Sequence, residues 1–439
     1  MKTVTFAFAL LLFLSFNISA QETESLNSLI EEALVNNPRI KAARAGAESS
    51  ANRPSQEGSL PNPIIGGRIK NVSFSEFTLG EDPRSDIQAF IAQEIPFPGK
   101  LASKEKIAIE EAESRRWLSD ATSRKVVREL KQSYYEWSFI EESIEITERN
   151  KDLLNKFVRI AEAKYEVGMG IQQDVIRAQV EVSGFIERLE LLNQKKEIIE
   201  ARIKKILNRS QRSPLNRPDE LTKPEVIFTL EEITEAASVY SPDLKSSQDL
   251  IESRKEALKL AEKEYLPDFI LGATYFNRDG GRGDLDDIWE VSLGLRVPLY
   301  FWRKERFGVQ EAALDVSEAN ENYEALKNDV LFIIKDSFIS ASTAEKLTDL
   351  YKEGIIPQST LSLESALSAY QVGEVDFLTL LNNLVTLFNF ELEYFEQLTA
   401  LNTSIARIEE VSGLDLTGGG MIDTAKNVST AKEAGGKND

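Results

Sequence analysis

The sequence of 439 residues contains no cysteine and no histidine. Without cysteine there are no disulfides and no thiolate ligands, and without histidine the commonest metal ligand and general base is missing. Nearly all nucleophilic triads are thereby excluded, so we expect no enzyme, no cofactor and no metal site. The formal net charge of −20 repels phosphate backbones, so nucleic acid is not an expected partner.

Long apolar runs are scarce, and the clearest one lies at the N-terminus. Lys2 is followed by an apolar run over 6–16 and by small residues that end at Ala20. This pattern predicts a secretory signal peptide over residues 1–20, with a buried N-terminal helix as the alternative. No cysteine follows the predicted cleavage site, so we expect no lipid anchor. No stretch approaches the roughly 20 apolar residues of a membrane helix, so any membrane entry must use strands.

The segment 100–166 has neither proline nor glycine, which predicts a helix of about 65 residues and about 100 Å. After it, apolar residues recur at spacings of three and four over 175–206, interrupted only at Lys196. The same pattern covers 377–408, interrupted only at Glu391. A repeat of 3.5 residues keeps one side of a helix facing a partner, so both segments are predicted to form long coiled-coil helices.

The same short motif introduces both coiled-coil segments. Tyr165-Glu166-Val167-Gly168 precedes Asp174, and Tyr370-Gln371-Val372-Gly373 precedes Asp376. The glycines predict tight tips, because a residue with positive φ commonly ends a helix. A carboxylate near a helix start is favoured by about 0.3–1 kcal/mol, which explains the two aspartates without any function.

Two pairs of candidate strands precede the long helices, at 64–72 with 87–95 and at 269–276 with 288–297. In 288–297 apolar residues alternate with polar ones. This fits a membrane strand between lipid and water, or an ordinary strand packed on a soluble core. Four strands cannot close a barrel, and lipid does not tolerate open sheet edges. Either subunits associate, or the sheet stays outside the membrane.

The order of these elements occurs twice, which predicts two structural repeats and a mainly α protein with a small β part. The first repeat covers 21–208, with a strand hairpin at 64–95 and a long helical hairpin at 100–207. A proline-rich linker, 209–228, follows. The second repeat covers 229–412, with a strand hairpin at 269–297 and a long helical hairpin at 304–410, and a tail at 413–439 is expected to be disordered.

Local motifs recur along the chain in the order that these repeats predict. They include Asn37-Pro38-Arg39-Ile40, Leu60-Pro61-Asn62-Pro63 and Gln93-Glu94-Ile95-Pro96, together with the two tip motifs. From about residue 26 to 416, the chain thereby resembles the TolC-type outer-membrane efflux family. Segment 93–100 is similar to the branch that works with heavy-metal and related proton-driven pumps. The resemblance implies a homotrimer whose subunits each give four strands to a twelve-stranded transmembrane β-barrel, continued by a helical barrel.

The resemblance also implies a function. Members of the family are passive exit ducts of the outer membrane, with a large periplasmic part, that dock a periplasmic adaptor (membrane fusion protein) and an inner-membrane pump. The alternatives are a soluble periplasmic coiled-coil scaffold, or an adaptor without a pore. Adaptor docking is expected at the tips, at Val167, Gly168, Met169, Val372, Gly373 and Glu374.

A gate is expected beside the tips, at Asp174, Asp376 and Tyr370. In a trimer the aspartates would form an acidic ring around the mouth. An arginine that some relatives use has no counterpart between Gly373 and Asp376. We therefore expect hydrogen bonds and acidic repulsion, and not a salt bridge, to control the mouth, and we expect Asp174→Ala to alter channel conductance.

Overall fold

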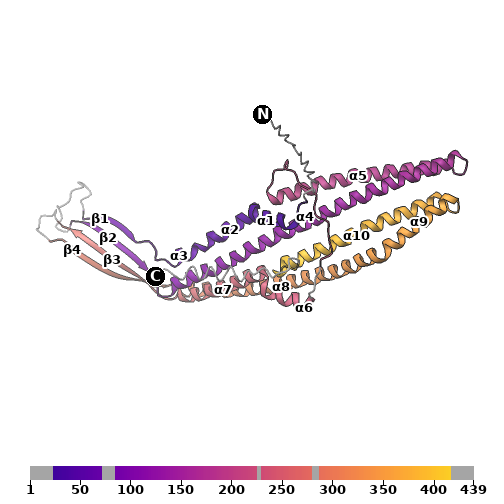
Figure 1. Cartoon of the computed structure of the whole chain (residues 1–439). Coiled ribbons are helices and arrows are strands. Elements are labelled where there is room, and N and C mark those ends of the chain that lie inside the picture. Colours follow the sequence, from indigo (N-terminus) through magenta and orange to yellow (C-terminus); the bar gives the residue numbers. More distant parts are fainter. Residues whose placement is uncertain (1–22, 72–84, 225–228, 279–285, 417–439) are drawn as a thin grey trace, which may run out of the picture. The chain divides into compact units, whose positions relative to one another are not determined.

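The computed structural model describes residues 23–71, 85–224, 229–278 and 286–416 (Figure 1). The predicted signal peptide, most of both strand loops and the predicted tail from residue 417 lie outside these residues. The expected disorder of the tail from residue 413 is wrong for 413–416, because Leu416 is buried and its N–H donates to Glu409. The chain divides into two compact units, and each takes segments from both halves of the sequence. The tip unit is Met1–Glu32, Ser133–Thr222 and Glu353–Glu396, and the sheet unit is Ala33–Gln132, Lys223–Lys352 and Gln397–Asp439.

A single four-stranded antiparallel sheet gives the sheet unit its name. Its strands pair in the order β1-β2-β3-β4, so β1 and β4 are the edges (Figure 1). The central pair joins the two halves of the sequence, with Ile87 opposite Asn277 and Ile95 opposite Phe269. The predicted strands are confirmed to within two residues at each described end. Their bounds are β1 Ile64–Lys70, β2 Asp86–Ile95, β3 Asp268–Asn277 and β4 Ile288–Arg296.

The edge strand β4 carries an exposed apolar face. Trp289, Val291 and Leu293 are each more than 70% exposed, and Leu295 follows on the same side. Successive side chains of a strand point to opposite faces, so these residues lie on one face, with Glu290 and other polar or small residues on the other. The alternation predicted from the sequence is thus confirmed, and no other described residue covers this face.

Two helices of the sheet unit begin at side-chain caps. The Asn37 side chain accepts the backbone N–H groups of Arg39 and Ile40, and Thr229 forms a capping box with Glu232. The helical segment after Asn37 divides at Asn52 into two helices, although nothing before Pro54 in the sequence interrupts it. Pro54 has no N–H to donate to the preceding turn. The helices are α2 Pro38–Ala51, α3 Arg53–Glu57, α6 Leu230–Tyr240, α7 Pro242–Lys263 and α8 Glu305–Leu350.

Three helices contribute residues to both units, namely α1 Leu26–Asn36, α4 Lys100–Glu166 and α10 Phe377–Ser412. The 67 residues of α4 confirm the long helix predicted from the lack of proline and glycine. Within the described ranges, no helix has an apolar stretch that is long enough to span a membrane.

Two helical hairpins form the tip unit. The C-terminal part of α4 turns into α5 Gln172–Leu207, and α9 Ile356–Val372 turns into the first part of α10 (Figure 1). The predicted coiled-coil side of each helix is confirmed by burial, with Phe185 and Phe388 in edge-to-face contact, ring centres 5.0 Å apart. The buried core of the unit also includes Leu154, Phe157, Ala178, Leu363, Tyr370, Phe377, Leu380 and Leu384.

The two residues that interrupt the apolar repeats both form ion pairs with α4. Lys196 Nζ lies 2.7 Å from Glu141 Oε1, and Glu391 Oε1 lies 2.7 Å from Arg149 Nη2. Glu391 also accepts a hydrogen bond from the Asn150 side chain. Each interruption therefore places a paired charge at a helix contact, where it favours one register over its neighbours.

The helix that leads to the second tip is irregular near Gly354 and Pro357. A π-helical turn, Tyr351–Ile355, separates α8 from α9, and Pro357 lies in the first turn of α9. Proline cannot donate the backbone hydrogen bond that a continuous helix needs there. Gly308, in contrast, lies inside regular α8.

Candidate functional site

The two tips have the same backbone geometry. Gly168 and Gly373 have φ of +74° and +84°, and each follows the end of a helix. At the first tip, Met169 N–H donates to the Lys164 carbonyl over 2.8 Å. At the second, Glu374 N–H donates to the Ala369 carbonyl over 2.9 Å. Together with bonds from the glycine N–H groups, these form Schellman motifs, which explains why glycine occupies both positions.

The aspartates after the tips occupy different helix positions. Asp376 is the N-cap of α10, and its carboxylate accepts hydrogen bonds from the N–H and Oγ1 of Thr379, over 2.8 and 2.6 Å. Asp174 lies within the first turn of α5, whose N-cap is Ile171. The sequence motif therefore predicted two equivalent aspartates, but only Asp376 caps its helix.

Opposite pKa shifts distinguish the two carboxyl groups. Partial burial raises the pKa of Asp174 above 3.8, and the negative charge of Asp376 raises it further. Hydrogen bonds from Thr379 lower the pKa of Asp376. The cations Lys164 and Arg177 partly offset the rise at Asp174. Asp376 thus holds its charge, and Asp174 is the carboxyl group of the pair that accepts a proton more readily.

Tyr370 is the buried centre of this cluster, only 4% exposed. Its ring packs edge-to-face on Phe377, and the Lys164 ammonium lies 4.4 Å from its centroid. Lys164 also donates a hydrogen bond to the Tyr370 carbonyl. Burial and the charge of Asp174 raise the pKa of the Tyr370 hydroxyl, which has no hydrogen-bond partner among the described residues.

The predicted docking residues lie on the surface of the two tips. The side chains of Val167, Met169 and Val372 are 68%, 78% and 73% exposed. Glu374 and both tip glycines are exposed as well. The end of each hairpin thus presents exposed apolar side chains to solvent.

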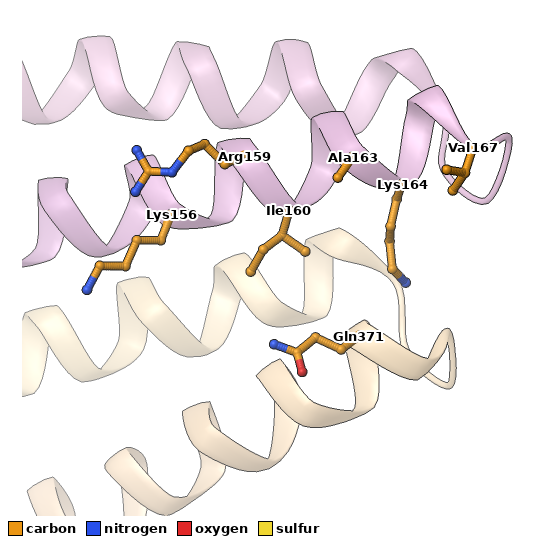
Figure 2. A pocket seen from close by; sticks show the side chains of 7 residues that line it. All are labelled: Lys156, Arg159, Ile160, Ala163, Lys164, Val167 and Gln371. Atoms are coloured by element: carbon orange, nitrogen blue, oxygen red, sulfur yellow. The ribbon is translucent and has the colours of Figure 1, made fainter.

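A basic groove runs beside the first tip, between α4 and α9 (Figure 2). Its volume is about 660 Å³. The cations Lys156, Arg159 and Lys164 lie along one stretch of α4, and Gln371 of α9 lies across from them (Figure 2). In the part of the chain that the structure describes, Lys156 and Arg159 have no ion-pair partner. The other lining residues are Ile160, Ala163 and Val167.

The sequence motifs did not point to this groove, nor to Lys164 and Arg177 as part of the aspartate cluster. A signal was present, because Lys156, Ile160, Ala163, Lys164 and Val167 recur at intervals of three and four and so share one helix face. The motifs could not show that this face lies opposite α9. Across the described residues, no group of three or more acidic side chains is arranged to hold a metal ion.

Comparison with known proteins identifies the fold and the family model that the chain matches. The model described as outer membrane efflux protein matches residues 29–209 and again 234–414. No individually curated protein is significantly similar in sequence.

Several solved outer-membrane proteins have a similar fold. VceC of Vibrio cholerae has a TM-score of 0.74 at 16% identity, covering 88% of this chain and 96% of its own. The CmeC channel of Campylobacter jejuni has a TM-score of 0.75 at 17% sequence identity, and the match covers 92% of this chain and 88% of CmeC. The MtrE channel of Neisseria gonorrhoeae, solved in an open state, has a TM-score of 0.73 at 15% sequence identity. The match covers 88% of each chain.

Proposed function

The chain belongs to the outer membrane efflux protein family, and on this basis we propose that it is a passive exit duct of a tripartite efflux system. The observation that carries the proposal is the family match over both halves, joined to a channel fold over most of the chain. We propose a homotrimer in the outer membrane, in which the two open edges β1 and β4 pair with neighbouring subunits to close a twelve-stranded barrel. Such a duct needs no catalytic residues.

The tip unit would face the periplasmic adaptor and the inner-membrane pump. Exposed Val167, Met169 and Val372 offer an apolar contact, and the basic groove offers charge. The groove lies on a chain with a net charge of −20, so its unpaired cations favour an acidic partner helix. We propose that the adaptor's helical tips seat on this combined surface.

Conductance and mass test the proposal together. Residues 21–439, purified in detergent, are expected to have the mass of a trimer and to give a low, cation-selective conductance in planar bilayers. In cells the protein should remain in the outer membrane after a high-salt wash. A monomer that is released by salt and never conducts would instead indicate the soluble scaffold or an adaptor.

We propose that Asp174, Asp376 and Tyr370 control the mouth, and this role predicts a pH response. The pKa of Asp174 is raised in the folded chain, so the fold favours the protonated carboxyl group. This contribution to stability is present at low pH and is lost as the pH rises through the raised pKa. Acidification protonates Asp174 and so removes its repulsion with Asp376. Open probability is therefore expected to fall as pH is lowered from neutral, with a midpoint above 3.8.

Two neutral variants check the assignment in single-channel recordings. Asp174→Asn should give a low open probability already at neutral pH and abolish the titration. Asp376→Asn keeps an N-cap but removes the neighbouring charge, so its midpoint should move to lower pH. If Asp174→Asn titrates like the natural protein, Asp174 does not control the mouth.

A further inference from the structure

A cluster of exposed aromatic and aliphatic side chains follows the membrane-type strand β4. Tyr300 and Trp302 are 70% and 52% exposed, and Leu299 is 66% exposed. With Tyr265 and the other residues of 297–302, they line a pocket of about 640 Å³. This volume lies in the range of about 300–1,000 Å³ that is usual for small-ligand sites.

The backbone holds this cluster in a fixed arrangement. The N–H groups of Arg303 and Lys304 both donate to the Tyr300 carbonyl, over 2.9 and 3.0 Å. Arg306 N–H donates to the Phe301 carbonyl over 2.9 Å, which leads the chain into α8. The Phe301 ring lies between those of Tyr265 and Trp302, at centroid distances of 6.3 and 5.3 Å. The pocket is therefore a built feature of the turn.

Cations follow the pocket residues in the sequence. Arg303 and Lys304 come directly after Trp302, Arg306 lies two residues further on, and all three are exposed. The Lys304 side chain is 84% exposed, and its Nζ lies 3.7 Å from Glu305 Oε1. An exposed ion pair at this distance is weak. Arg303 has no ion-pair partner among the residues that the structure describes. An acidic ligand would therefore find positive charge beside an apolar pocket.

The corresponding turn of the first half differs in this respect. There the cation is Lys100, which is buried and lies 2.9 Å from Asp268 and 3.2 Å from Glu264. Phe97 is partly buried and stacks on Phe269. The cation and the ring of the first turn are thus paired with residues of the second half, whereas Arg303 and the rings of Tyr300 and Trp302 are exposed.

We infer that residues 297–306, with Tyr265, form a binding site for an anionic phospholipid. The pocket continues the exposed apolar face of β4, so an acyl chain along that strand brings its phosphate to Arg303 and Lys304. Amphipathic rings lie at the headgroup level of membrane proteins, and lysine and arginine attract anionic headgroups there. The inference rests on the proposed membrane insertion, and it places the site in the leaflet next to α8.

Native mass spectrometry of the purified, delipidated trimer tests the inference with defined lipids. Phosphatidylglycerol should be retained in preference to phosphatidylcholine. Arg303→Gln/Lys304→Gln should weaken phosphatidylglycerol retention about 10- to 30-fold and leave phosphatidylcholine unchanged. Tyr300→Ser/Trp302→Ser should weaken both lipids. As a matched control, Lys195→Gln/Lys205→Gln removes two exposed lysines of α5 and should change neither.

Several results would overturn the site. Equal retention of the two lipids, or phosphatidylglycerol retention unchanged in Arg303→Gln/Lys304→Gln, excludes selective recognition. Displacement of the lipid by millimolar inorganic phosphate alone would mean that a free anion suffices. Conductance in planar bilayers separates this failure from that of the proposed function. A trimer that conducts without lipid preference overturns only the site, whereas a chain that neither assembles nor conducts overturns both.

Discussion

Replacing Lys131 with methionine is expected to be the most destabilising single change on the sheet unit, at about 3–5 kcal/mol. Lys131 Nζ lies 2.6 Å from Glu409 Oε2, and both side chains are about nine-tenths buried. The other oxygen of Glu409 accepts the Leu416 N–H over 2.9 Å, so this carboxylate also fixes the chain that follows α10. Methionine keeps the apolar stem of lysine but removes the ammonium from beside a buried negative charge.

Thermal unfolding of the detergent-solubilised protein measures this effect. A loss of this size should lower the Tm by roughly 6–20 °C. The double variant Lys131→Met/Glu409→Gln should recover much of the loss, because no buried charge remains. Lys255→Met breaks an exposed pair with Glu252 on the same unit and should cost less than about 1 kcal/mol. If Lys131→Met and Lys255→Met lower the Tm equally, burial does not make the Lys131–Glu409 ion pair more important than the exposed Lys255–Glu252 pair.

The features that the sequence predicted well are those that local chemistry determines. Strand alternation in 288–297 and the coiled-coil spacing of 175–206 and 377–408 are properties of neighbouring residues. The strand forms where the alternation predicts it, and burial follows the coiled-coil spacing. Gly168 and Gly373 could likewise be predicted as caps, since a positive φ is a local requirement.

What the sequence left open depends on contacts between distant segments. Lys196 and Glu391 look like defects in an apolar repeat, because their partners lie on another helix. Asp174 and Asp376 look equivalent in the repeated motif, but each helix has its N-cap three residues after the tip glycine, at Ile171 and at Asp376, so only Asp376 caps a helix. Spacing can show that residues share a face, but not which element that face meets.

Reversing the charge of the basic groove is expected to abolish efflux while leaving the channel intact. In Lys156→Glu/Arg159→Glu, an acidic partner helix would meet two like charges in place of two opposite ones. Like-charge contacts across an interface cost several kcal/mol, so binding of the cognate adaptor should weaken by about 30-fold or more. Both side chains are exposed and unpaired within the described residues, so folding and trimer formation should not change.

The measurement is the affinity of purified trimers for the adaptor at several salt concentrations, alongside drug or metal tolerance of a deletion strain that carries each variant. The neutral pair Lys156→Gln/Arg159→Gln should bind with intermediate affinity and a weaker salt dependence, because the attraction is lost without any repulsion. Lys195→Glu/Lys205→Glu changes net charge equally on α5, away from the groove, and should bind normally. If the two double reversals weaken binding alike, the whole surface acts through its net charge. If only the groove reversal weakens binding, the charged face of α4 recognises the partner. The part of the affinity that does not change with salt then belongs to the apolar contact of Met169 and the exposed valines of the tips.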